Sequence, residues 1–338
     1  MSFSKTIHIN LLTPQIPVVK SRSLTELKKA LSGVVKGFFF LLISFLILPA
    51  TAQNDSIPKK DTVLINKKLL TGILVSEAVV YAGSFTGLYF LWYKNYPQSE
   101  FHFFNDGKEW MQMDKMGHVT SNYYIAKGCY SLLRISGVNE KKSVIYGALT
   151  GLAYQTTIEI FDGFSQEWGF SWGDMAANIA GAALFTSQQL LWKEQRLIMK
   201  LSCHRTKFAD YRPDLLGGNW AESFLKDYNG LTFWLSLNIH SFLPDQCRFP
   251  RWLNIAIGYG AEGMLGGYGN PATYRGKPLP FYERYRQFYL STDIDLTRIK
   301  TNKKWLKIIF NTIGFIKIPA PAIEFNTRKE VKFHYFYF

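Results

Sequence analysis

The sequence predicts an α+β protein in which an N-terminal four-helix, membrane-associated bundle is followed by a β-rich C-terminal region. Helix-periodic segments occupy residues 67–204, and period-two alternation with many aromatic residues dominates residues 205–338. Of the 338 residues, 47% are hydrophobic and 16% aromatic, whereas only 19% are charged. Soluble domains carry about 25% charged residues. The composition therefore favours a membrane-associated protein over a soluble cytosolic enzyme.

Residues 1–52 have the pattern of a signal peptide. Three lysines precede the apolar run 37–48, and a small-residue A-x-A site ends at Ala52. The charged region before the apolar run is long, so an uncleaved anchor and a misassigned start are the alternatives to cleavage after Ala52. Residues 53–66 then form a linker. We expect an exported chain in the cell envelope that is membrane-associated and faces the periplasm, at either the inner or the outer membrane.

The chain is basic. Its formal net charge of +14 falls to +9 when residues 1–52, which hold six Lys or Arg and one Glu, are removed. This charge favours contact with anionic membrane lipid or with lipopolysaccharide, and a solvated basic surface is the alternative. Nucleic acid is not an expected partner, because the basic residues are scattered and export removes the chain from the cytoplasm. The sequence identifies no protein partner.

Three cysteines, Cys129, Cys203 and Cys247, have no metal-ligand spacing. Their odd number argues against a disulfide framework. None stands at the expected cleavage site, so a lipid-modified N-terminal cysteine is not expected either.

Four helices are predicted in the first half of the chain. The first, 69–93, is largely apolar, and its 25 residues exceed the roughly 20 needed to cross a bilayer. Three shorter helical patterns follow at 114–135, 143–161 and 173–199. Small residues spaced four apart, Gly147 with Gly151 and Ala177 with Gly181, predict close packing between helices.

Whether the last three helices cross a membrane stays open. With four crossings after a cleaved signal, Arg134, Lys141 and Lys142 would lie on the exported side, against the usual positive-inside bias. A bundle that rests on the membrane is therefore the alternative to one that spans it.

Strand alternation marks the second half of the chain. About five strands are too few to close a membrane barrel, which usually needs at least eight. We therefore expect a small sheet that packs on the helices or lies at the membrane surface. The expected elements are strands at 232–240, 252–259, 287–296, 322–325 and 331–338, a glycine-rich turn at 263–269 and an amphipathic helix at 303–315.

Three polar clusters in the helical half form the candidate site, and each lies at helical spacing in an otherwise apolar segment. Because residues three or four apart share one helix face, the clusters can converge into one polar pocket inside the bundle. The seven candidate residues are Asp114, Lys115, His118, Glu159, Asp162, Asp174 and Asn178.

The residue types in these clusters suit several kinds of chemistry. Asp114 and His118, one helical turn apart, fit an acid and base pair or two metal ligands. Buried carboxylates on the second cluster would need a cation, for which Lys115 is the obvious partner. Asp174 is expected to cap its helix. The identity of any metal or cofactor stays open.

Two interpretations of the clusters remain. In the first they tie three helices together, because buried polar groups need partners whatever the function. In the second they form the site of a hydrolase or transferase that acts on a lipid or phosphate group, ahead of a metal-binding or transport role. No serine lies in a recognised nucleophile motif. We expect a cell-envelope protein that binds envelope lipid or lipopolysaccharide, with that enzyme as the alternative.

The motifs also carry a resemblance to a known family. DKMGH at 114–118, EIFDGF at 159–164 and GFSWGDMAANIAG at 169–181 resemble the exported family that includes YfiM, described as predicted periplasmic lipoproteins, over roughly residues 67–200. The order of the motifs is also similar to that in VanZ-like membrane proteins. The resemblance implies an envelope location and points to the same seven residues, but it brings no reaction with it.

The chain departs from that family in two respects. It lacks the lipobox cysteine that a lipid anchor requires. Its second half, with KDYNG at 226–230 and PAPAIEFN at 319–326, looks like the β-rich extension of Bacteroidetes-type members. The added region is therefore expected to supply membrane contact instead of a lipid.

Overall fold

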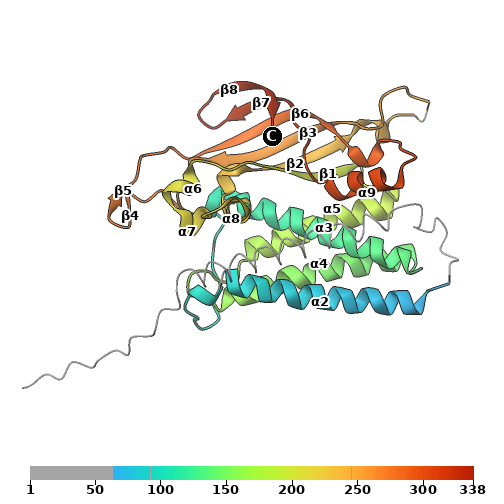
Figure 1. The fold of residues 1–338 in the computed structure, drawn as a ribbon, viewed down its shortest axis with the longest axis horizontal. Coiled ribbons are helices and arrows are strands. Elements are labelled where there is room, and N and C mark those ends of the chain that lie inside the picture. Colours follow the sequence, from blue (N-terminus) through green and yellow to red (C-terminus); the bar gives the residue numbers. More distant parts are fainter. Residues whose placement is uncertain (1–63, 92, 245) are drawn as a thin grey trace, which may run out of the picture.

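The computed structural model describes residues 64–91, 93–244 and 246–338 (Figure 1). The expected signal peptide, 1–52, and all but the last three residues of the expected linker lie outside the described residues. Helices make up the N-terminal half and strands most of the C-terminal half, which confirms the mixed α and β prediction. In Figure 1 the helices form one layer and the sheet a second layer that lies against it.

Four long helices build the helical layer. They are α2 (Lys67–Leu91), α3 (Met113–Ile135), α4 (Glu140–Gly163) and α5 (Trp172–Trp192). Helix α3 is the central one, since it packs on α4 and α5 and its other side contacts the sheet. Asn139 caps α4 by accepting a hydrogen bond from the Lys142 N–H, 2.9 Å away.

Small residues set the spacing inside this layer, as the sequence predicts. A methyl group at Gly147 of α4 would lie 2.6 Å from the carbonyl oxygen of Ala126 on α3. At Gly151 and Gly181 it would likewise collide with Asn122 and Val119 of α3. Only glycine therefore lets α4 and α5 approach the central helix this closely.

Helix α2 is fastened to α4 by polar and aromatic contacts. The hydroxyl groups of Tyr81 and Thr157 lie 2.6 Å apart, and the Tyr93 hydroxyl donates to Asp162 Oδ1 at 2.7 Å. The Phe85 ring packs on Tyr154. These contacts place α2 beside the site described below.

The sheet has six antiparallel strands in the order β1-β2-β3-β6-β7-β8. They are β1 (Leu197–Cys203), β2 (Leu231–Asn238), β3 (Leu253–Glu262), β6 (Tyr285–Ile294), β7 (Ala320–Asn326) and β8 (Val331–Tyr337). The expected helix 173–199 is corrected here, because α5 ends at Trp192 and residues 197–203 form an edge strand. The run LIMKLSC is apolar enough to satisfy either period, so the sequence pattern did not separate them.

Shorter elements connect the strands. Three short helices, α6 (Phe208–Tyr211), α7 (Pro213–Leu216) and α8 (Trp220–Lys226), fill a stretch to which the sequence assigned no structure. A small hairpin pairs β4 (Thr273–Tyr274) with β5 (Lys277–Pro278), and α9 (Lys304–Ile313) confirms the expected amphipathic helix. The segment after α9 covers the edge of β1, where the Lys317 N–H donates to the Leu201 carbonyl at 2.9 Å.

One face of the sheet is apolar from edge to edge. A single row across paired strands runs through Met199, Leu235, Ile257, Leu290, Ile323 and Phe333. Met199 is buried in the core shared with the helices, whereas Ile257 is 62% exposed and Phe333 58% exposed. The helical layer thus covers this face over β1 and β2 and leaves it uncovered over the later strands.

The opposite face is polar and buried, because the sheet curls around it. Three strands, β3, β6 and β7, separate Thr232 of β2 from Tyr337 of β8 in the sheet order, yet the two hydroxyl groups are 3.0 Å apart. At the centre Lys200 pairs with Asp293 at 2.7 Å, with neither side chain exposed to solvent. The Ser236 hydroxyl donates to the same carboxylate at 2.6 Å. The inside of the sheet therefore combines these polar groups with a buried cluster around Trp234 and Tyr289, whereas its outside is apolar.

We predict that Asp293→Ala lowers the free energy of unfolding by about 3–5 kcal/mol, since it leaves Lys200 buried without a counterion. Asp214→Ala is the matched control. It breaks an ion pair with Arg275 of similar length, 2.6 Å, but both of those side chains are more than half exposed. Exposed pairs contribute at most about 1 kcal/mol. Chemical denaturation measures both changes, and equal losses in the two variants would contradict the buried pair.

Candidate functional site

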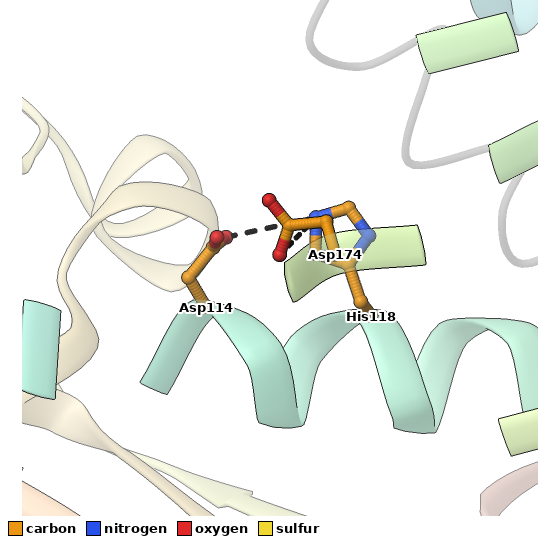
Figure 2. A group of neighbouring side chains, drawn as sticks. All are labelled: Asp114, His118 and Asp174. Atoms are coloured by element: carbon orange, nitrogen blue, oxygen red, sulfur yellow. Dashed lines mark ion pairs between the residues drawn. The ribbon is translucent and has the colours of Figure 1, made fainter. Parts of the chain in front are cut away.

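The three polar clusters of the sequence come together where α3 and α5 begin and α4 ends. His118 is their meeting point. Its Nε2 lies 3.8 Å from Asp114 Oδ1 and 3.7 Å from Asp174 Oδ1, and its Nδ1 lies 3.7 Å from Glu159 Oε1. Nδ1 is also 3.1 Å from Asn178 Oδ1. Figure 2 shows Asp114 and His118 on one face of α3, with Asp174 reaching them from α5.

Lys115 supplies the positive charge. Its Nζ lies 2.6 Å from Asp106 Oδ2, 2.7 Å from Asp174 Oδ1 and 3.3 Å from Asp114 Oδ2. The side chain is only 14% exposed, so these ion pairs are shielded from water. We call Lys115 and its surroundings the Lys115 cluster, which comprises Asp106, Asp114, Lys115, His118, Glu159, Asp174 and Asn178.

The structure adds residues that the sequence did not single out. Asp106 comes from the loop before α3, and the Ser171 hydroxyl donates to its Oδ1 at 2.6 Å. The Tyr228 hydroxyl, from the segment before β2, donates to Asp114 Oδ1 at 2.8 Å. Neither residue lies at helical spacing from the motifs, so periodicity gave no signal for them. The turn sequence around Asp106 offers no distinctive pattern.

Two of the seven sequence candidates have roles other than expected. Asp162 does not join the Lys115 cluster, since its carboxylate turns to Tyr93 of the segment after α2. Asp174 does not cap α5. Instead Ser171 is the cap residue, and its hydroxyl accepts from the Asp174 N–H at 3.1 Å. The Ser171 N–H donates to Glu159 at 3.2 Å, so this one serine links α4, α5 and the loop.

The chain enters α3 through an unusual backbone. Trp110, Met111 and Gln112 all have left-handed conformations, with φ of 45°, 52° and 64°. Such conformations cost non-glycine residues roughly 1–3 kcal/mol each and persist only where the surroundings hold them. Here the Trp110 N–H donates to the Gly267 carbonyl at 2.9 Å, and Tyr259 and Arg286 of the sheet bond to the next two residues. The sheet thus fixes the turn that places Asp114 and Lys115.

A cavity of about 620 Å³ opens beside the cluster. It is lined by α2 on one side and by α3 and α4 on the others, and β2 and α8 complete it. Pockets for small molecules usually measure about 300–1,000 Å³ and are mostly apolar. Asp106, Asp114, His118 and Asp174 of the Lys115 cluster line one part of the cavity, and the apolar lining includes Val80, Leu88, Ile125, Ile158, Leu201, Leu225 and Phe233. Further charged side chains in the lining are Glu77, Glu109, Asp162, Asp214 and Lys226.

The electrostatics of this end are dominated by acidic groups. Burial, together with the negative charges of Asp114 and Asp106, raises the pKa of Glu109, which lines the cavity, to about 7. Burial acts in the same direction on Asp106, but hydrogen bonds with Asp174, Lys115 and Ser171 outweigh it and hold the pKa of Asp106 below its ordinary value. The pocket therefore favours positive charge and hydrogen-bond donors.

Three side chains of the cluster present metal-ligand atoms to one another. One atom each from Asp114, His118 and Asp174 lie within 4.8 Å of one another. A histidine nitrogen with two carboxylate oxygens is a donor set used by zinc and other first-row divalent ions.

Comparisons with known proteins agree with the envelope location. A family model described as predicted periplasmic lipoprotein (DUF2279) matches residues 101–189, a span that contains all seven sequence candidates. The match supports an exported, envelope-associated location and confirms the resemblance to a predicted periplasmic lipoprotein family. The narrower likeness to YfiM and to VanZ-like proteins stays a prediction. No curated protein and no solved structure gave a significant match.

The raised pKa of Glu109 predicts a specific pH dependence. A carboxyl group whose pKa rises from 4.5 to about 7 on folding holds its proton longer in the folded state. Stability therefore falls as pH rises from about 4.5 to about 7. We expect Glu109→Gln to remove this loss, so that its melting temperature exceeds that of the wild type by more at pH 8 than at pH 5.

The control for this prediction is the same substitution at Glu167, which is exposed in the loop between α4 and α5. Its melting temperature should follow the wild type at both pH values. If the Glu109→Gln and wild-type curves run parallel between pH 5 and 8, Glu109 does not titrate in this range.

Proposed function

We propose that the protein lies in an envelope membrane and binds an amphiphilic ligand, with the apolar chain of the ligand in the cavity and its polar head at the Lys115 cluster. The observation that carries the proposal is the cavity of about 620 Å³, which has apolar walls and ends at a buried charged group. An amphiphile has the same division between an apolar body and a polar end.

The outward side chains of the bundle support a location in the bilayer. Residues 175–192 of α5 contain no charged residue, a length of about 27 Å at 1.5 Å per residue. The hydrocarbon core of a bilayer is about 30 Å thick. Among the described residues one helix, Lys67–Phe90, is long and apolar enough by itself to cross a membrane. Exposed apolar side chains on the three outer helices include Leu74, Val75, Val79, Ile145, Leu149, Ile179 and Leu191.

The two ends of the bundle carry different kinds of side chain, one basic and the other aromatic, as the ends of membrane-spanning bundles often do. At one end the starts of α2 and α4 and the end of α5 meet, since the Gln189 side chain donates to Glu140 Oε1 at 2.8 Å and the Asn66 N–H donates to the Ser136 carbonyl at 2.9 Å. Basic residues flank this end: Lys67, Lys68, Lys141, Lys142, Lys193 and Arg196.

Aromatic rings gather at the other end. Phe103 stacks on Trp172 with ring centroids 5.9 Å apart, and the Phe101 ring packs edge-on against Phe164. All four rings are more than 40% exposed. Aromatic belts and basic flanks are typical of the two interfaces of a membrane-spanning bundle.

The charge of the cluster indicates which head group fits. Three aspartates surround Lys115. The pKa values of Asp106 and Asp114 are lowered, so these two carboxylates act as hydrogen-bond acceptors, whereas burial raises the pKa of Asp174 to about 10. A head group with hydroxyl or ammonium donors complements these acceptors. An anionic group alone would face like charge. The proposal therefore favours a donor-bearing lipid head.

A hydrolase or transferase acting on a lipid or phosphate group is the second candidate. It is favoured by His118, which lies within 3.8 Å of three carboxylates at the cavity wall and is thus placed for proton transfer. Ser171 is no free nucleophile, because its hydroxyl already bonds to Asp106 and to the Asp174 N–H. In this candidate a water molecule makes the attack. Release of the head group from a lipid substrate by wild type but not by His118→Ala would identify it.

Insertion into a bilayer predicts that Ile179→Lys is harmful. Ile179 is 54% exposed near the middle of α5, where a lysine costs about 2.5–3.5 kcal/mol in a membrane. We expect less protein in the carbonate-resistant membrane fraction. Ile65→Lys is the matched control, since Ile65 is 50% exposed but lies at the basic end. Equal tolerance of both changes would place the α5 face in water.

Ligand binding predicts a different effect of two neighbouring substitutions on α2. Val80 lines the cavity, whereas Val79 is 63% exposed on the outer face. Val80→Phe should fill the cavity, and Val79→Phe should leave it open. The probe is a phosphatidylethanolamine with a photoreactive acyl chain, incorporated into nanodiscs in the presence of a metal chelator.

The readout is labelling of α3, which the other helices and the sheet surround so that Ser121 is its one exposed residue. Labelled α3 peptides should fall at least fivefold in Val80→Phe and stay at the wild-type level in Val79→Phe. Absence of α3 labelling in the wild type would refute a lipid in the cavity.

A further inference from the structure

We propose that Asp114, His118 and Asp174 bind one divalent transition-metal ion, such as Zn²⁺, at the charged end of the cavity. The ion site deepens the proposed amphiphile-binding function, on which its role in head-group recognition rests. The binding of the ion itself is argued from the geometry of the cluster alone.

The three ligand atoms already stand close to the arrangement that an ion requires. His118 Nε2 is 3.8 Å from Asp114 Oδ1 and 3.7 Å from Asp174 Oδ1. Around a tetrahedral zinc ion with bonds of about 2.0–2.2 Å, ligand atoms lie about 3.4 Å apart. Small side-chain movements therefore suffice to close the site. Asp114 and His118 are held at the required spacing by one turn of α3 (Figure 2).

The histidine is oriented as a ligand. Its Nδ1 faces the side-chain oxygen of Asn178, 3.1 Å away, which accepts a hydrogen bond and so places the proton on Nδ1. Nε2 then carries a lone pair, and this atom faces the two aspartates. Metal-bound histidines usually donate their second N–H to such an acceptor. Tyr228 orients Asp114 in the same manner through its 2.8 Å hydrogen bond.

A second, independent observation points to a missing partner. Glu159 is 1% exposed, and its Oε1 has no hydrogen-bond partner among the described residues, although it points toward His118. An unpaired buried carboxylate oxygen is costly. It faces Nδ1 of His118, on the opposite edge of the ring from the Nε2 atom proposed to bind the ion. A cation at Nε2 would offset part of its buried charge without contacting it.

The excess of acidic groups favours a bound cation. The cluster contains four carboxyl groups, those of Asp106, Asp114, Glu159 and Asp174, but one lysine. An added cation would reduce this excess of acidic groups. Lys115 binds Asp114 through Oδ2 and leaves Oδ1 to face His118. At Asp174, however, Lys115 Nζ and His118 Nε2 face the same oxygen, Oδ1, at 2.7 and 3.7 Å. The proposed ion would therefore share this oxygen with the lysine.

The donor atoms select the kind of ion. Magnesium and calcium prefer sites made of oxygen atoms, whereas an imidazole nitrogen favours zinc and its neighbours. Three protein ligands leave one position of a tetrahedral ion open, as in zinc sites that bind substrate. All three ligands lie on the cavity wall, so the open position faces the proposed ligand. A phosphate or hydroxyl oxygen of a head group is the ligand that this position would take.

The test measures metal binding without any lipid ligand. The full chain, in detergent and stripped with a chelator, is equilibrated with Zn²⁺, Mg²⁺ or Ca²⁺, and bound metal is quantified by mass spectrometry and calorimetry. We expect about one Zn²⁺ per chain and no comparable binding of Mg²⁺ or Ca²⁺. His118→Ala, Asp114→Asn and Asp174→Asn should each weaken Zn²⁺ binding at least tenfold, and Tyr228→Phe should weaken it less.

His334→Ala is the matched control. His334 also contacts a carboxylate, Glu324 Oε2 at 2.8 Å, but lies on the sheet away from the cluster. Its Zn²⁺ affinity should equal that of the wild type. Circular dichroism monitors folding, and the isosteric Asn variants decide the question if His118→Ala does not fold.

The proposal is overturned if the wild type retains no Zn²⁺, or if folded Asp114→Asn and Asp174→Asn bind it as tightly as the wild type. Because the lipid-labelling experiment is done without metal and the metal titration without lipid, either function can fail while the other stands.

Discussion

The N-terminal half of the molecule depends on the ion pairs of one largely enclosed lysine. Lys115 holds Asp106 from a loop, Asp114 from its own helix and Asp174 from α5 within 3.3 Å. Carboxylates that are removed from water must find a positive partner, because an uncompensated buried charge costs several kcal/mol. The loop before α3 and the start of α5 are therefore fixed around this ammonium group, and Ser171 completes the connection through α4.

The sheet also pairs its buried charges, but it does so inside its own curl and not between helices. Its polar face is buried by curling, with Lys200 and Asp293 paired at 2.7 Å inside, and its apolar face points outward. Helix α3 covers that face over the first two strands. Over β3, β6, β7 and β8 the same rows of apolar side chains continue without cover, as Ile257 and Phe333 show. An apolar surface of this extent is consistent with the proposed bilayer location, in which lipid takes the place of a second layer.

The cavity lies between the helical layer and the sheet, so the proposed ligand would contact both. Helix α2 is fastened to α4 through Tyr81 and Tyr93, and the cavity lies between it and α3, with β2 and α8 closing the remaining sides. The acidic end of the cavity attracts donors and cations. A divalent ion at Asp114, His118 and Asp174 would change its preference toward oxygen ligands such as phosphate. The proposed ion and the proposed ligand are therefore linked by the same excess of acidic groups.

The sequence by itself determined the four helices, the strands after residue 205 and the convergence of most candidate residues. Helical periodicity is local, and a spacing of three or four residues places Asp114 with His118 on one face without any knowledge of the fold. Small residues likewise predicted how closely α4 approaches α3. The family match covers the segments that helical periodicity also marks, because both depend on residues that lie close together in the sequence.

Only the tertiary structure decided which distant groups complete the site. Asp106 and Tyr228 reach the cluster from loops, Asp162 turns away to Tyr93, and residues 197–203 leave the expected helix to form an edge strand. The left-handed turn before α3 is held by residues of the sheet more than 100 positions later in the chain. These placements follow from burial and charge pairing between segments that are remote in the sequence. Such contacts produce no periodic pattern of residues.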